Sequence, residues 1–535
     1  MLKEFAMYAR FFSRLPGFLT KKITPQDGRK YIINNLADRE SRFLRISQKS
    51  IYGNPKSPYL PLLKEAGCEV GDLEQMVYSD GLEETLGKLA DAGVRITFDE
   101  YKGRTSIDRN GVTIQQAEYD FDNPASAKDF ESRTGASRSA GTRTVFDLDF
   151  ISANWGCHQA VLLEAIGAYS YPCGLWLPIM PSSGPIVAIT RAKIGSTPAR
   201  WFTPITARDI NPELKNRLGT KGLVTFARFC GIPIPYPEFV SVDDAVVVAR
   251  WIEETLGEYG GCTLNTYSSA AVRVCQAAEK NGLNIANLTI TAGGEPISDA
   301  KAAEVTKAGA KLVPGYGAMD VGMLGYGCLN PVHCDEVHLY TDDFAIVQRP
   351  REVPHSRATV NALLITSLSP LTPKILLNVE SGDYGVVEHR SCGCIWEELG
   401  LDLHLHSIRA FDKLTSGGMT FIGTDLVRVI EEVLPARFGG APTDYQMVEE
   451  EDEKGLTKMS VLVNPNIGNI DERELIHIIL ESLSQGTDVH RMMAKMWQES
   501  GTLRVLREKP HTTAAGKLLP LHIKNSDSKT KKQII

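Results

Sequence analysis

Hydroxyl side chains, arginines and glycines alternate between Ser132 and Thr144 of this 535-residue chain. The stretch holds no large apolar residue, so neither a buried helix nor a buried strand is expected there. Glycines let the backbone turn its N–H groups inward, hydroxyls add donors, and guanidinium groups fit phosphate oxygens. The composition predicts a loop that binds a polyphosphate, although the Walker A spacing is absent. The alternative interpretation is a solvated surface linker.

The elements around this loop are expected to form an α/β fold. Apolar residues recur at helical spacing over residues 30–88. Further helices are expected over 241–257, 268–281 and 298–309, and strands over 145–150, 185–190, 288–291 and 311–313. This alternation predicts a large domain, residues 1–411, with a mixed or largely parallel sheet flanked by helices.

The pattern of expected helices and strands changes beyond about residue 408. A hairpin is expected over 446–450 and 459–463, and a strand over 503–506. Asp471 and Glu474 resemble a capping box at the start of a helix. We therefore expect a small, mobile α+β domain over residues 412–535.

The composition excludes several classes of protein. A hydrophobic fraction of 43%, a charged fraction of 23% and a net charge of −7 are ordinary for a globular protein and argue against a nucleic-acid partner. The ten cysteines form no regular disulfide framework, which favours the cytoplasm. No apolar run is long enough for a membrane span, and residues 1–22 do not have the pattern of a signal peptide.

Five further motifs follow the hydroxyl-rich loop in order: Thr291–Pro296, Gly315–Asp320, Glu380–Gly385, Ile408–Lys413 and Thr513–Lys517. Each motif alone is a weak signal. Together, in this order and spacing, they resemble the acyl-adenylate-forming superfamily and, within it, the phenylacetate–coenzyme A ligase branch. The likeness covers nearly the whole chain.

This resemblance implies an enzyme that activates a carboxylic acid with ATP and Mg²⁺, forms an acyl-AMP and releases pyrophosphate. The acyl group then passes to a thiol, for which coenzyme A is the first expectation. An amine or a carrier protein is the alternative acceptor, and a non-catalytic nucleotide-binding relative is a further alternative. A homodimer is compatible with this branch.

The resemblance also assigns roles to residues. It implies that Asp383 binds the ribose with Arg409 close by, that Lys517 bridges the reacting carboxylate and α-phosphate, and that Asp412 is the hinge of the small domain. Asp320 would contribute to catalysis by holding Mg²⁺. The phosphate contacts would be Ser132, Thr134, Gly135, Ser137, Arg138, Ser139, Gly141, Thr142 and Arg143, and the adenine contacts Gly293, Gly294, Glu295, Pro296, Tyr316 and Gly317.

The chain departs from the family pattern at three places. The phosphate loop lacks the usual lysine, and arginines carry its charge instead. Met319-Asp320 stands where Thr-Glu is usual, which shortens the metal ligand by one methylene. Phe411 replaces a second acidic residue at the hinge.

Cys392 and Cys394 resemble half of a structural zinc site found in some members of the branch. Cys328 and His338, with Cys334 as an alternate, would complete four ligands. The competing interpretation is chance proximity in a chain with ten cysteines.

Other residues are weaker candidates for chemistry. Cys157 and His158 are adjacent and lack a third partner, which argues against a nucleophile and base. Asp342 and Asp343 are interpreted as a turn. The aromatic residues Trp155, Tyr169, Tyr171, Trp176 and Trp201 are interpreted as core or as walls of an acyl pocket.

Overall fold

The structure is a computed structural model. It describes residues 2–109, 111–133, 143–180, 182–204, 214–352, 359–410, 415–416, 419–420, 424–451, 457–484, 503–513 and 516–524. The expected hinge residue Asp412 and residues 134–142 of the expected phosphate loop lie outside these ranges.

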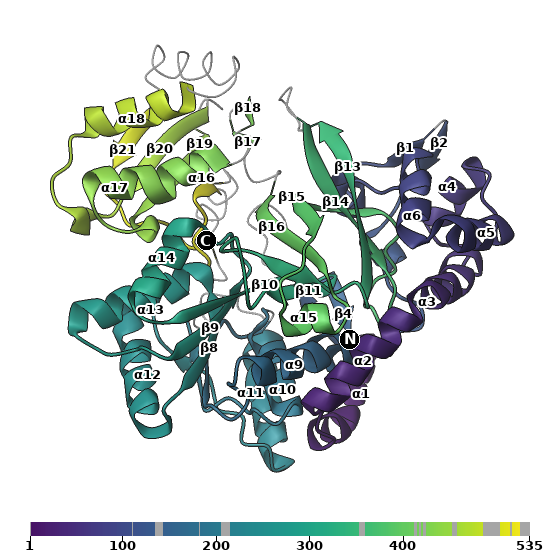
Figure 1. Ribbon diagram of the computed structural model, residues 1–535, viewed down its shortest axis with the longest axis horizontal. Helices are drawn as coiled ribbons and strands as arrows, with labels where there is room; N and C mark the ends of the chain where they lie inside the picture. Colours follow the sequence, from purple (N-terminus) through teal and green to yellow (C-terminus); the bar gives the residue numbers. More distant parts are fainter. Residues whose placement is uncertain are drawn as a thin grey trace.

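A 12-stranded mixed sheet forms the centre of the N-terminal part of the chain (Figure 1). Its order is β13-β14-β15-β16-β12-β11-β10-β9-β8-β5-β6-β7. The parallel strands are β5 (Cys173–Trp176), β6 (Arg200–Thr203), β7 (Glu238–Phe239), β8 (Cys262–Tyr267), β9 (Leu288–Gly293) and β10 (Lys311–Ala318). On the other side of β10, each strand pairs antiparallel with the next. In order from β10, these strands are β11 (Gly322–Gly327), β12 (Val337–Leu339), β16 (Leu403–Ala410), β15 (Val379–His389), β14 (Thr359–Ser367) and β13 (Phe344–Glu352).

The helices predicted over 241–257, 268–281 and 298–309 are present as α12 (Ala245–Tyr259), α13 (Ser268–Asn281) and α14 (Asp299–Lys307). Three further helices of this part of the chain were not predicted: α9 (His158–Ala165), α10 (Gly184–Lys193) and α11 (Leu214–Phe229). The N-terminal helices are α1 (Leu2–Thr20), α2 (Pro25–Ala37), α3 (Arg39–Ile46), α4 (Tyr59–Glu65), α5 (Val70–Asp80), α6 (Leu82–Asp91) and α7 (Phe98–Tyr101). The predicted fold class, an α/β sheet flanked by helices, is confirmed.

Two local predictions were wrong. Residues 185–190 were predicted as a strand but form part of the fully buried helix α10. The prediction failed because a short apolar run does not distinguish a buried strand from a buried helix. Residues 145–150 divide between β4 (Arg143–Phe146) and the short helix α8 (Leu148–Phe150). The sheet is also parallel on one side of β10 only, since β10 and β11 are joined by a tight turn that brings the chain back antiparallel.

The C-terminal elements have their own hydrophobic core, which extends from Leu426 to Leu521. They lie beside α14 (Figure 1). A four-stranded sheet has the order β21-β20-β19-β22. Its strands are β19 (Tyr445–Glu451), β20 (Thr457–Val463), β21 (Leu503–Leu506) and β22 (Leu521–Lys524), packed with α16 (Thr424–Arg428), α17 (Leu434–Phe438) and α18 (Glu472–Ser484). The exact boundary between residues 411 and 412 stays a prediction.

A buried charged network ties the N-terminal helices to the sheet. His158 Nε2 lies 3.1 Å from Asp342, and Arg42 donates to the Asp342 carbonyl at 2.7 Å and contacts Asp343 at 3.4 Å. Tyr31 donates to Asp343 at 2.7 Å. Burial alone would lower the pKa of His158, but the neighbouring carboxylates raise it. Asp342 and Asp343 do form a turn, as predicted. They also bind the buried side chains of Arg42 and His158.

Replacing Arg42 by Met leaves buried carboxylates without their cation. We expect a loss of about 3–5 kcal/mol in the free energy of unfolding, measured as the first transition in urea. Arg45→Met is the matched control, because Arg45 is exposed and pairs with Asp38 on the surface; its loss is expected to be at most about 1 kcal/mol. Equal losses in the two variants would contradict the role of the network.

Candidate active site

A cavity of about 460 Å³ lies where β8, β9 and β10 end and the sheet changes from parallel to antiparallel pairing. The carboxyl ends of parallel strands at such a change are where open α/β sheets bind ligands. The predicted site residues that line the cavity are Gly293, Gly294, Glu295, Pro296, Tyr316, Gly317, Asp320, Asp383, Arg409 and Lys517. Motifs spread over more than two hundred residues of sequence therefore meet in one place.

Glycines bring the backbones at this edge unusually close. A Cβ atom at Gly293 would lie 2.5 Å from the Gly315 carbonyl oxygen, and one at Gly317 would lie 2.5 Å from the Gly322 carbonyl oxygen. Both distances are below van der Waals contact, so larger residues would push the strands apart. The glycines of the motifs thus set the shape of the cavity wall.

One wall of the cavity is built by Tyr316 and Asp383. The Tyr316 hydroxyl donates to Asp383 Oδ2 at 3.1 Å, and the Asp383 backbone N–H donates to Ser381 Oγ at 3.1 Å. Burial and the Asp383 carboxylate raise the pKa of Tyr316 well above its ordinary value. Arg409 lies beside this wall and donates to Asp335 at 3.3 Å. The wall offers an aromatic ring and a carboxylate that is held in place.

Asp320 is paired with a cation that the sequence motifs did not indicate. Lys102 Nζ lies 2.7 Å from Asp320 Oδ2 and 4.7 Å from the centre of the Tyr101 ring. Burial would raise the pKa of Asp320, but the Lys102 ammonium outweighs this and lowers it. Lys102 follows the short helix α7 and lines the same cavity. No local pattern marks it, because its partner is more than two hundred residues away.

Lys517 approaches the cavity from the C-terminal elements. Its Nζ atom lies 5.0 Å from the centre of the Tyr267 ring and beside Gly294. A tight turn holds its backbone, since the Thr513 N–H donates to the Lys517 carbonyl at 2.8 Å and Gly516 has φ of +76°. The side chain thus lies against the segment that contains Gly293 and Gly294.

The base of the expected phosphate loop is a hairpin of β3 (Phe130–Arg133) and β4. Ser132 belongs to β3, and residues 134–142 fall outside the described ranges. Arg143 pairs with Asp122 at 3.0 Å and with Glu131 at 2.9 Å. It is not among the residues that line the cavity.

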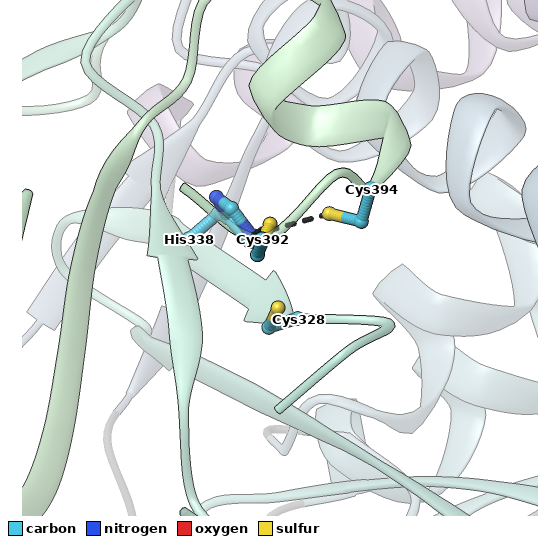
Figure 2. Close-up of side chains that lie close together, drawn as sticks. All are labelled: Cys328, His338, Cys392 and Cys394. Atoms are coloured by element: carbon cyan, nitrogen blue, oxygen red, sulfur yellow. Dashed lines mark hydrogen bonds between the residues drawn. The ribbon is translucent and has the colours of Figure 1, made fainter. Parts of the chain in front are cut away.

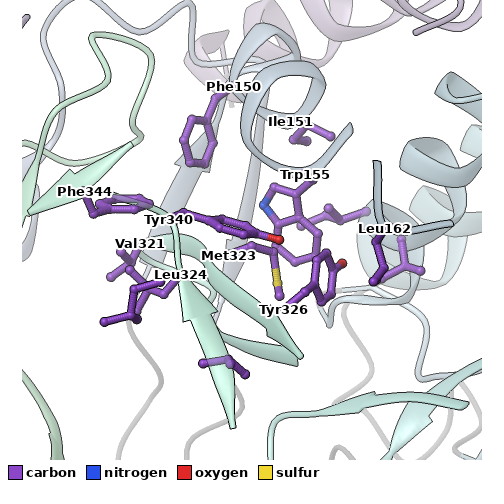
Figure 3. Packing of buried hydrophobic residues seen from close by; sticks show 14 of the residues in the cluster. Phe150, Ile151, Trp155, Leu162, Val321, Met323, Leu324, Tyr326, Tyr340 and Phe344 are labelled. Atoms are coloured by element: carbon purple, nitrogen blue, oxygen red, sulfur yellow. The ribbon is translucent and has the colours of Figure 1, made fainter. Parts of the chain in front are cut away.

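Apolar side chains line the part of the cavity that β11 contributes. Trp155, Met323 and Tyr326 lie together there, within a larger buried cluster (Figure 3). Trp176 and Trp201 are instead fully buried in the core. Of the five aromatic residues considered as walls of an acyl pocket, Trp155 lines the cavity, whereas Tyr169, Tyr171, Trp176 and Trp201 do not.

Four side chains gather beside β12 and the end of β11. Ligand atoms of Cys328, His338, Cys392 and Cys394 lie within 4.8 Å of one another (Figure 2). His338 Nδ1 is 2.6 Å from the Leu401 carbonyl, so it carries the proton and leaves Nε2 facing the sulfur atoms. The distances from Nε2 are 3.2 Å to Cys394 and 3.5 Å to Cys392. Cys334 instead donates to the Ile297 carbonyl.

Among the helices of the described residues, none is long and apolar enough to cross a membrane.

Cys157 is buried, and burial raises the pKa of its thiol, while His158 is engaged by Asp342. A nucleophile and base at these two positions is therefore not supported by the geometry.

No protein-family model matches the sequence, and the curated proteins compared with it gave no match. Among solved structures, a 2-hydroxyisobutyryl-CoA ligase in complex with its acyl-AMP and CoA is 13% identical with a TM-score of 0.45, over 93% of this chain and 88% of that one. An anthranilate CoA ligase with anthranoyl-AMP is 11% identical with a TM-score of 0.44, over 83% and 75%. The amide bond synthetase McbA from Marinactinospora thermotolerans is 12% identical with a TM-score of 0.42, over 98% and 100%.

Proposed function

We propose that the protein is a ligase that activates a carboxylic acid with ATP. The observation that carries this proposal is the convergence of Gly293, Tyr316, Asp320, Asp383 and Lys517 on one cavity. A ring, a carboxylate, a glycine-lined wall and a lysine are what a nucleotide and a reacting carboxylate require.

In the proposed reaction, a carboxylate oxygen attacks the α-phosphorus of ATP. The bond from that phosphorus to the bridging oxygen breaks, and pyrophosphate leaves. Most of the catalysis of such a step is positioning and charge neutralisation. Tyr316 and the backbone of the segment from Gly293 to Pro296 would enclose the adenine, and Asp383 would accept hydrogen bonds from the ribose hydroxyls. Lys517 would neutralise charge between the carboxylate and the α-phosphate.

Mg²⁺ would enter with the nucleotide and could bind Asp320 only if Lys102 first moved away from it. The carboxylate is hard and buried, as a magnesium ligand should be, but in the free protein Lys102 occupies it. We propose that Lys102 turns to the phosphates when MgATP binds, which leaves Asp320 for the ion. Lys102 would then supply part of the positive charge that the phosphate loop lacks without its usual lysine.

The acyl group is proposed to pass to a thiol, with coenzyme A as the first candidate. The thiol sulfur would attack the acyl carbonyl carbon, and AMP would leave. An amine or a carrier protein is the alternative acceptor, and the similar structures include both CoA ligases and an amide bond synthetase. The apolar side chains around Trp155 favour an acid with an apolar acyl part.

A structural zinc ion is proposed at Cys328, His338, Cys392 and Cys394. Three sulfur atoms and one imidazole nitrogen are a common zinc ligand set. The hydrogen bond from His338 to the Leu401 carbonyl fixes the tautomer that such a ligand needs. The ion would tie the turn before α15 (Ile395–Glu398) to β11 and β12.

Acid-dependent exchange of labelled pyrophosphate into ATP tests the proposed activation, with a panel of aryl, fatty and amino acids. We expect exchange with some acid and a loss of at least about 100-fold in Lys517→Ala, as for a contact made in the transition state. Lys307→Ala, on the exposed surface of α14, should stay within about 2-fold. Exchange that persists in Lys517→Ala would contradict the assigned role.

Nucleotide affinity tests Asp383 without knowledge of the acid. Asp383→Asn weakens the proposed charged hydrogen bonds to ribose, which are worth about 1.5–3 kcal/mol, so the Kd of AMP should rise about 10- to 100-fold. Calorimetric titration measures this. Asp402→Asn changes an exposed carboxylate that contacts His389 and should leave the Kd unchanged. Equal affinity in both variants would remove Asp383 from the nucleotide site.

Metal analysis tests the zinc proposal. The purified protein should hold about one zinc ion per chain, and a chelator should lower its Tm. Cys394→Ser should lose the ion, whereas Cys230→Ser, which lies outside the cluster, should keep it. Protein free of zinc, with a Tm that chelators do not change, would refute the site.

A further inference from the structure

Glu295 lies in the motif expected to contact adenine, yet its carboxylate bonds to other parts of the protein. Oε2 accepts hydrogen bonds from Ser268 Oγ at 2.9 Å and from the Ser269 N–H at 2.8 Å. Oε1 accepts from Ser269 Oγ at 2.9 Å and from the Leu518 N–H at 2.9 Å. The residue is 8% exposed. One buried carboxylate therefore joins the start of α13 to the residue that follows Lys517.

The start of α13 is a favourable place for this charge. The helix has 14 residues, and its first backbone N–H groups have no partner within the helix. The helix dipole adds a positive potential at this end. The carboxylate is thus stabilised from the N-terminal part of the chain and can offer its remaining acceptor capacity to Leu518.

Fixing the Leu518 N–H also fixes Lys517. Thr512 and Leu518 form an antiparallel bridge. Within the turn, the Lys517 N–H donates to Thr513 Oγ1 at 3.1 Å and the Gly516 N–H donates to the Thr513 carbonyl at 2.8 Å. Hydrogen bonds therefore hold the described residues around Lys517 together. A contact on Leu518 sets where the Lys517 Cα atom lies and whether its ammonium reaches the cavity.

A second contact holds the same two regions together. Lys301 on α14 pairs with Glu431 of the C-terminal elements at 2.8 Å, and the side chains are only 2% and 3% exposed. Lys301 Nζ also donates to the Pro296 carbonyl at 3.0 Å. The segment from Gly293 to Lys301 thus lines the cavity and also contacts the C-terminal elements, through Leu518 and Glu431.

We propose that Glu295 is a positioning residue that docks the Lys517 turn against the cavity, with the Lys301–Glu431 pair as a second brace. The inference rests on the proposed function, because it assigns Glu295 to the step in which Lys517 acts. Glu295 acts through Leu518 and not through a contact with the nucleotide. Removing its carboxylate would leave nucleotide binding intact and misplace the lysine.

Hydrogen exchange resolved at the Leu518 amide tests the docking without any activity. Glu295→Ala should speed exchange at this amide by at least about 10-fold, since its acceptor is gone. Glu295→Gln keeps one acceptor oxygen and should give an intermediate rate. Glu279→Ala, an exposed site on α13 that pairs with Lys307, is the matched control and should leave the rate unchanged. An unchanged Leu518 amide in both Glu295 variants would overturn the proposal.

The pyrophosphate exchange and the Kd of AMP then separate positioning from nucleotide contact. In Glu295→Ala, kcat for exchange should fall about 10- to 100-fold, as for a misplaced catalytic group, while the Kd of AMP changes by less than about 2-fold. A fall in AMP affinity that equals the fall in exchange would make Glu295 a nucleotide contact and overturn the proposal. If wild type shows no exchange with any acid, the proposed function fails, and the Leu518 amide still decides whether Glu295 docks the turn. If Glu295→Ala does not fold, Glu295→Gln is used instead, both for hydrogen exchange at Leu518 and for the comparison of pyrophosphate exchange with the Kd of AMP.

Discussion

The close approach of β9, β10 and β11 is the constraint on which the candidate site depends. Gly293, Gly317 and Gly322 stand where side chains would collide with a neighbouring backbone or side chain. Their absence of side chains lets the sheet change from parallel to antiparallel pairing within one turn. That change opens the cavity at the carboxyl ends of the parallel strands. The chemistry of the site follows from which polar groups the surrounding elements point into this opening.

Charge inside the cavity is held in pairs before any ligand binds. Lys102 neutralises Asp320, and Arg409 neutralises Asp335. A buried carboxylate without a partner would be strongly destabilising. Pairing with Lys102 lowers the pKa of Asp320, and the two ion pairs hold both carboxylates in place. In the proposed reaction, the nucleotide would exchange partners with groups that are already held in place. Asp320 would bind Mg²⁺ only after Lys102 has moved away from it.

The site residues that could be named from the sequence and that line the cavity lie in short recognisable motifs. The Gly-Tyr-Gly sequence at 315–317 and the lysine after Thr-Ala-Ala-Gly resemble known motifs, so Tyr316 and Lys517 could be named in advance. The expected fold class followed from the order of helices and strands. The sequence placed α10 wrongly because its short apolar run fits a buried strand equally well.

The contacts that the sequence did not predict join residues far apart in the chain. Lys102 and Asp320, Glu295 and Leu518, and Arg42 and Asp343 each pair across more than two hundred residues. Nothing in the neighbourhood of either partner marks such a pair, because only the folded sheet brings them together. Cys328 and His338 were named with the Cys392 and Cys394 pair from a family resemblance, and the structure does bring the four together.

In the proposed reaction, a carboxylate oxygen attacks the α-phosphorus of ATP in this cavity. Turnover of an acid labelled with ¹⁸O in its carboxylate tests that step, with the released AMP analysed by mass spectrometry. AMP should carry one ¹⁸O atom from the acid, because the bridging oxygen stays with AMP when the acyl group leaves. AMP without label, or label found instead in inorganic phosphate, would contradict it.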